Sequence, residues 1–110
     1  MFEPDFIIVI DTTIDKEIID KGKKFNTKII YNSVNKIKGV YSIDATDIAI
    51  RELNNPLGAN LALLGGFVAV AGHISLKHLE DAIRIELKKY PKNIIEGNIR
   101  AARRGYEAVK

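Results

Sequence analysis

Cysteine is absent from this chain of 110 residues. The absence excludes disulfides, thiolate zinc sites and cysteine-ligated iron–sulfur clusters within the chain, and it leaves no thiol nucleophile. Neither a GxGxxG turn nor a P-loop motif occurs, so two common phosphate-binding loops are missing as well. The residues therefore show no pattern typical of thiol-dependent or nucleotide-dependent catalysis.

Positive and negative charges nearly balance. The chain carries 17 basic and 14 acidic residues, which gives a net charge of +3. A nucleic-acid-binding domain usually has a larger and clustered basic excess. Arg100, Arg103 and Arg104 form a basic group that could meet a phosphate, but no aromatic stacking platform accompanies it. We expect this group to be a solvated face or a subunit contact, and nucleic-acid binding is not predicted.

Residues 57–72 contain no charged residue, yet they include Asn60 and several glycines. A helix that crosses a membrane needs about 20 apolar residues. The segment is therefore predicted to be a buried helix, and no membrane contact is expected. The first residues carry no basic stretch, so a secretory signal is not predicted and a cytoplasmic location is expected.

Length and an apolar content of 46% indicate one globular domain over residues 1–110. Short apolar runs at residues 6–10, 28–32 and 40–43 predict three strands. The first run is apolar on both faces, as in the middle of a covered parallel sheet. A short helical pattern at residues 15–24 predicts a β-α-β unit with a right-handed crossover and mostly parallel strands.

Four helices are predicted after the strands, at residues 44–53, 57–72, 75–90 and 93–109. Asp44 and Ser75 are suited to cap the first and third of these. Residues 76, 79, 83, 87 and 90 are all apolar and predict one buried stripe on the third. The predicted fold class is α/β, a small three-layer type with three short strands followed by four helices.

The second predicted helix has a stripe of small residues. Their spacings of 4, 3, 4 and 3 place them on one side, and they are Gly58, Ala62, Gly65, Ala69 and Gly72. A glycine costs a helix about 1 kcal/mol relative to alanine. Close approach of a second backbone is the expected compensation, so a tight helix–helix contact is predicted.

The titratable residues do not form an obvious site. His73 and His78 have no metal-ligating partners at useful spacing, and both are interpreted as structural. The acidic residues near the first turn are scattered and predict no paired-carboxylate site; they are Asp11, Asp15, Glu17 and Asp20. No catalytic residue, metal site or cofactor site is predicted within the chain.

The chain resembles the gamma subunit of the 2-oxoacid:ferredoxin oxidoreductases, and the resemblance rests on short motifs in a fixed order. An alanine-threonine-acid helix start comes first and a glycine-tyrosine-glutamate motif last. The matching segments lie at residues 43–49, 55–60, 63–65, 74–76, 79–80, 82–83, 98, 101 and 105–107. The strand at residues 6–10 is similar to the family's mid-subunit strand. Family gamma subunits begin with a strand and a glycine-rich turn of the GxGGQG type, and this chain has neither, so it resembles the C-terminal half of the subunit.

The resemblance implies a non-catalytic structural or interface subunit, or a fragment of one. The family decarboxylates a 2-oxoacid oxidatively to an acyl-coenzyme A and passes electrons to ferredoxin, and thiamine diphosphate and the iron–sulfur clusters belong to partner subunits. The substrate is predicted to be 2-oxoglutarate or pyruvate, with 2-oxoglutarate favoured by the Asn-Pro motif. Expected partners are the other subunits and a chain that carries the missing glycine-rich half, or a second copy when the chain is isolated. The residues predicted to form an interface are Asn55, Gly58, Asn60, Ala62, Gly65, Ala69, Gly72 and Tyr106.

A second hypothesis belongs to another class. The same fold would then serve as a standalone module that binds a small ligand or a protein. The helix start after Ser75 or Asn55 is where such a module would take an anion.

Overall fold

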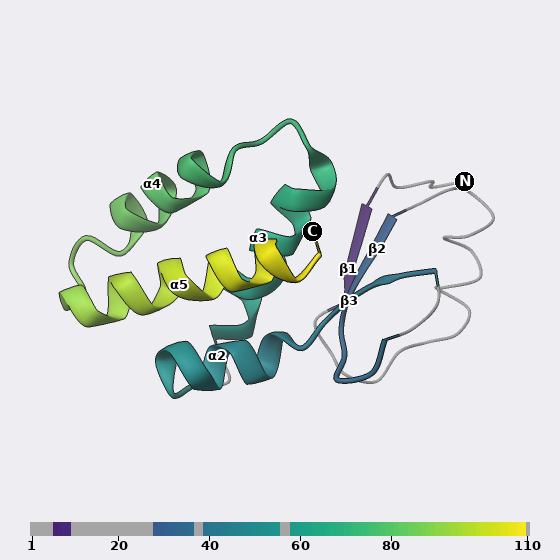
Figure 1. The fold of residues 1–110 in the computed structure, drawn as a ribbon. Helices are drawn as coiled ribbons and strands as arrows, with labels where there is room; N and C mark the ends of the chain where they lie inside the picture. Colours follow the sequence, from purple (N-terminus) through teal and green to yellow (C-terminus); the bar gives the residue numbers. More distant parts are fainter. Residues whose placement is uncertain (1–5, 10–27, 37–38, 56–57, 110) are drawn as a thin grey trace.

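A parallel sheet of three strands forms one end of the molecule (Figure 1). The computed structural model describes residues 6–9, 28–36, 39–55 and 58–109. The strands are β1 (Phe6–Val9), β2 (Lys28–Asn32) and β3 (Tyr41–Ile43), in the order β1-β2-β3. Residues 29–32 of β2 are all buried, so both faces of this central strand are covered. The helix predicted at residues 15–24 lies outside the described residues.

The first strand is paired with one neighbour among the described strands. β1 lies at one end of the described strand order and pairs there with β2, so the interpretation of residues 6–10 as a strand from the middle of a sheet stays a prediction. Ile8 is opposite Ile30, which is opposite Tyr41 on β3.

Four helices follow the strands and lie on the same side of the sheet in Figure 1. They are α2 (Ala45–Leu53), α3 (Ala59–Ala71), α4 (Leu76–Glu86) and α5 (Lys92–Ala108). The predicted class, an α/β fold with three short strands before four helices, is confirmed. None of the described helices is both long enough and apolar enough to cross a membrane.

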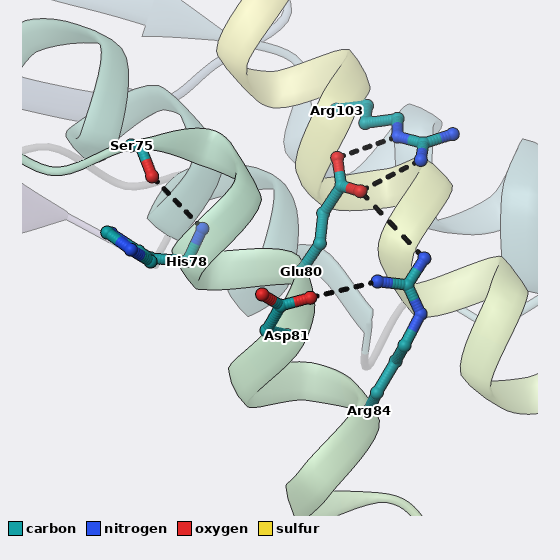
Figure 2. Close-up of polar contacts among 6 residues, drawn as sticks. All are labelled: Ser75, His78, Glu80, Asp81, Arg84 and Arg103. Atoms are coloured by element: carbon teal, nitrogen blue, oxygen red, sulfur yellow. Dashed lines mark hydrogen bonds and ion pairs between the residues drawn. The ribbon is translucent and has the colours of Figure 1, made fainter.

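The predicted helix starts are confirmed by their caps. Asp44 Oδ1 accepts a hydrogen bond from the Asp47 backbone N–H at 3.1 Å, at the start of α2. Ser75 Oγ accepts one from the His78 backbone N–H at 3.1 Å, at the start of α4 (Figure 2). Each side chain satisfies a backbone donor that the first turn of a helix leaves without an internal partner.

The end of α4 differs from its prediction. The helix was expected to continue to residue 90, but it ends at Glu86, and Leu87 caps it by donating its backbone N–H to Ile83 O at 2.9 Å. A turn then leads into Pro91, because proline disfavours helical geometry at the residue before it. Tyr90 therefore leaves the predicted stripe and is 57% exposed, while Ile83 in the same stripe is buried.

Two hydrophobic clusters form the core. The larger one joins the sheet to α2 and α3 and includes Ile30, Ile43, Ala49 and Leu63. The smaller one lies between α4 and α5 around Ile83, Ile99 and Ala102. Both clusters border α3 or α5, so the contact between these two helices holds the core together.

Candidate functional site

Among the described residues, no cluster of three or more histidine, cysteine or acidic side chains could hold a metal ion. His73 and His78 do not converge on other ligands. The His73 Nδ1 atom lies 3.1 Å from the Ala71 carbonyl oxygen, and the His78 ring stands beside the capped start of α4 (Figure 2). Asp11, Asp15, Glu17 and Asp20 lie outside the described residues. The polar and close-packed contacts of the described residues are concentrated at three junctions between helices and strands.

The first junction is the crossing of α3 and α5. A Cβ atom added at Gly65 would overlap the carbonyl oxygen of Ala102, and one added at Gly105 would overlap the carbonyl oxygen of Ala62. Each helix thus places a glycine against the backbone of an alanine on the other helix. All four residues are buried. The predicted tight helix–helix contact is confirmed for Ala62 and Gly65.

The small residues on α5 were not singled out from the sequence. Gly97, Ala101 and Gly105 recur every four residues and are all buried. A Cβ atom at Gly97 would come within 2.9 Å of the Glu52 carbonyl oxygen on α2. This small-xxx-small spacing was the signal that would have identified α5 as the partner of α3.

The predicted small-residue stripe on α3 is only partly used by the crossing. Gly58 stands before the helix, where an added Cβ would overlap Leu53 Cδ1. Ala69 is half-buried, and Gly72 ends the helix with a φ of 78° and no atom within 4 Å of an added Cβ. Two helices that cross at an angle touch near one point, so a stripe that runs the full length of α3 cannot remain in contact.

The other residues predicted at an interface lie after α2, at the start of α3 and near the end of α5. Asn55 and Asn60 are exposed, and Tyr106 is half-buried on α5. The Asn55 carbonyl oxygen accepts a hydrogen bond from the Gly58 backbone N–H at 3.2 Å. Contact of these residues with another subunit stays a prediction.

The second junction links the end of β2 to the start of α2 through Asn32. Its side chain is 3% exposed. The Oδ1 atom accepts hydrogen bonds from the backbone N–H groups of Ala45 at 3.0 Å and Thr46 at 3.4 Å, and the Nδ2 atom donates to Thr46 Oγ1 at 3.0 Å. Together with the Asp44 cap, these bonds satisfy the amide groups at the start of α2. The sequence signal for this link between β2 and α2 was a polar residue at the end of a buried parallel strand.

The third junction consists of ion pairs that fix α5 to its two neighbours. Glu52 on α2 accepts a hydrogen bond from Arg100 Nε at 2.8 Å and one from Arg104 Nε at 3.4 Å. Glu80 on α4 accepts two from Arg103, both at 2.8 Å (Figure 2). The paired geometry at Arg103 matches the two carboxylate oxygens to the planar guanidinium.

These contacts resolve the role of the arginine group. Arg100 and Arg103 reach Glu52 and Glu80 on the neighbouring helices. Arg104 does approach Glu107, at 3.9 Å. The three arginines are thus engaged in ion pairs inside the chain.

The arginine partners lower the pKa values of both carboxyl groups. Hydrogen bonds from Arg103 hold the pKa of Glu80 below its ordinary value of 4.5, and those from Arg100 do the same for Glu52, in each case against an opposing effect of burial. A carboxyl group with a lowered folded-state pKa stabilises the fold above its unfolded-state pKa. That stabilisation is lost as pH falls through the folded-state pKa.

A pH series on the Glu52→Gln, Glu80→Gln double variant tests these pairs. The arginines are about half exposed, so screening limits the expected loss at pH 7 to about 1 kcal/mol in total. The difference in unfolding free energy from the wild type, measured by urea denaturation, should shrink as the pH falls below 4.5 and the carboxyl groups of the wild type become protonated. The exposed Glu86→Gln variant is the control and should follow the wild type. Equal acid sensitivity of the double variant and the wild type would contradict the assignment.

Comparison with known proteins shows what this chain is similar to. The sequence model described as pyruvate ferredoxin/flavodoxin oxidoreductase matches residues 2–108. The pyruvate synthase subunit PorC of Thermotoga maritima is 35% identical, over 97% of this chain and 61% of that subunit. The 2-oxoglutarate synthase subunit KorC of Methanocaldococcus jannaschii is also 35% identical, over 64% of this chain and 36% of that subunit.

The fold is shared as well. A crystal structure of the pyruvate oxidoreductase subunit PORC from Thermotoga maritima superposes with a TM-score of 0.83 and 32% sequence identity, covering 99% of this chain and 66% of that one. The chain thus spans less than two thirds of the length of the subunits that it matches.

Proposed function

Since this chain belongs to the pyruvate ferredoxin/flavodoxin oxidoreductase family, we propose that it is a non-catalytic structural subunit, or part of one, in a pyruvate:ferredoxin oxidoreductase. The family resemblance first seen in the sequence is confirmed, and its relatives are the PorC and KorC subunits. The observation that carries the proposal is the match of almost the whole chain to these subunits, together with a described part that consists of helix–helix and strand–helix junctions.

Catalysis and electron transfer are assigned to partner subunits in this proposal. The chain has no cysteine, so its residues do not fit the thiolate ligation of an iron–sulfur cluster. It also has no glycine-rich phosphate loop to hold the diphosphate of thiamine diphosphate. Its contribution is to present a rigid surface to the subunits that carry these groups.

Pyruvate replaces 2-oxoglutarate as the favoured substrate of the complex. The pyruvate synthase subunit aligns with 97% of this chain, whereas the 2-oxoglutarate synthase subunit aligns with 64%. The Asn-Pro motif that suggested 2-oxoglutarate is thus outweighed by the extent of the match.

The alternative of a standalone anion-binding module places an anion at a helix start. At the start of α4 the Ser75 hydroxyl accepts the His78 backbone N–H, so one of the amide groups at this proposed site already has a partner.

Native purification tests the proposed function. The tagged chain, expressed in the organism that encodes it, should recover polypeptides of the other oxidoreductase subunits together with pyruvate-dependent reduction of ferredoxin. The same chain purified alone should show no such reduction and no heat of binding with thiamine diphosphate in calorimetry. Recovery of the chain alone, as a monomer that melts cooperatively, would contradict the proposal and favour the standalone module.

A further inference from the structure

Helix α4 is held to the molecule by fewer buried side chains than α3 or α5. Among its 11 residues Ile83 alone is buried, whereas α3 contains six buried residues and α5 contains five. In Figure 1, α4 lies along one side of α5 and α2 lies along the other. α4 therefore has the smallest buried contact of these three helices.

The contact of α4 also differs in kind from the α3–α5 crossing. At the crossing, a glycine on each helix lies against the backbone of the other helix. α4 contains no glycine, and it packs through side chains in the cluster that Ile83 shares with Ile99 and Ala102. Movement of α4 away from α5 would open this cluster but would leave the glycine contacts of α3 and α5 in place.

Both connections of α4 are suited to movement of the whole helix. Before it, residues 72–75 are exposed, and Gly72 has a φ of 78° with no atom within 4 Å of an added Cβ. After it, residues 88–93 are exposed. Hinges are usually a few loop or helix-terminal residues that absorb a change in φ and ψ. The two connections can therefore change conformation without disturbing the core of α3 and α5.

One ion pair joins α4 to α5 across this contact. The Glu80 side chain is 13% exposed, and it accepts two hydrogen bonds from Arg103, both at 2.8 Å (Figure 2). Arg84, on α4 itself, lies 4.0 Å from Glu80 and 3.3 Å from Asp81. α3, which also contacts α4, has no charged residue. The Glu80–Arg103 pair is thus the charged contact that opening of α4 would break.

We propose that α4 is a flap that opens from the α3–α5 pair while the other described helices stay folded, and that the Glu80–Arg103 pair holds it closed. Weakly packed elements commonly open at a lower free energy than global unfolding requires. Opening exposes the apolar side chains that α4 covers, Ile99 on α5 and Leu61 on α3. A partner that binds this surface would shift the balance toward the open form.

Hydrogen exchange of the full chain, measured at urea concentrations well below the unfolding midpoint, tests the flap. The amides of residues 80–87 should have protection factors about tenfold or more below those of the buried parts of α3 and α5. Their exchange should also depend less on urea, because opening of one helix exposes less surface than global unfolding does. Equal protection and equal urea dependence in all three helices would overturn the proposal.

Two matched variants test the ion pair. Glu80→Gln should speed exchange of the α4 amides by about threefold, the effect expected of a partly exposed pair. Glu52→Gln removes the ion pairs between α2 and α5, which stay intact when α4 opens. It should therefore speed exchange in α3 and α5 but leave α4 unchanged. Equal acceleration of α4 by both variants would show that α4 opens only when the whole chain unfolds.

A single introduced thiol gives a second measurement. The chain has no cysteine, so Ile99→Cys places one thiol beneath α4 and Ile43→Cys places one in the larger cluster. Both isoleucines are fully buried. Under native conditions Ile99→Cys should react with a thiol reagent about tenfold or more faster than Ile43→Cys. Equal reaction rates would contradict opening of α4 by itself.

Discussion

Replacing Gly65 with leucine is expected to destabilise the chain by about 3 kcal/mol or more, a large part of the stability of a small domain. In an isolated helix, glycine would give a less stable helix than leucine by about 1 kcal/mol. At the α3–α5 crossing the replacement is destabilising instead, because even a single added Cβ atom would overlap the Ala102 carbonyl oxygen. A carbonyl group in the middle of α5 cannot move aside as a flexible side chain can. Urea denaturation measures this effect through its midpoint and the free energy of unfolding.

The matched control for this substitution is Asn60→Leu. It introduces the same side chain on the same helix at an exposed position. Substitutions at exposed positions usually change stability by less than about 0.5 kcal/mol. A Gly65→Leu variant that unfolds at the same urea concentration as the control would mean that the two helix backbones do not meet in solution.

Replacing Asn32 with alanine is expected to cost about 3 kcal/mol. The substitution leaves the backbone N–H of Ala45 without its acceptor, and Ala45 is fully buried, so water cannot replace the lost bond. An unsatisfied buried donor costs about 1–3 kcal/mol. Loss of the bonds with Thr46 adds to this. Because Asn32 joins the sheet to α2, the amides at the start of α2 should lose protection in hydrogen exchange before the rest of the helix does.

Asn35→Ala is the control for the junction. Asn35 lies three residues further along, is exposed, and takes part in the local turn through its backbone groups, which contact Ser33 Oγ. Its replacement should leave stability nearly unchanged. Equal effects of the two alanine substitutions would show that the buried amide of Asn32 does not fix α2 to the sheet.

The helices and strands were predictable because each is determined by residues that are close together in the sequence. The apolar run at residues 28–32, the cap at Asp44 and the cap at Ser75 each act within a few residues, and all three appear where the sequence indicated. The order of the strands was not predictable in this way, because it depends on which strands meet in space. The end of α4 was misplaced, since an apolar repeat can continue past the residue at which the backbone leaves the helix.

The junctions were harder to predict than the elements. Arg100 reaches Glu52 and Arg103 reaches Glu80, across 48 and 23 positions of the chain. Pairing rules for a single helix consider only residues three or four apart. The small residues of α3 signalled a close contact but not its partner, which became clear once Gly105 was seen against Ala62.

The α3–α5 crossing also has a consequence for the synthesis of the chain. Gly65 is made long before Gly105, so α3 leaves the ribosome without the helix that will cover its small-residue face. At about 5–20 residues per second, the interval between the two glycines lasts about two to eight seconds. During that time an uncharged helix, Ala59–Ala71, is open to other nascent or newly released chains. Completion of this core is therefore a late event that follows translation of the last described helix.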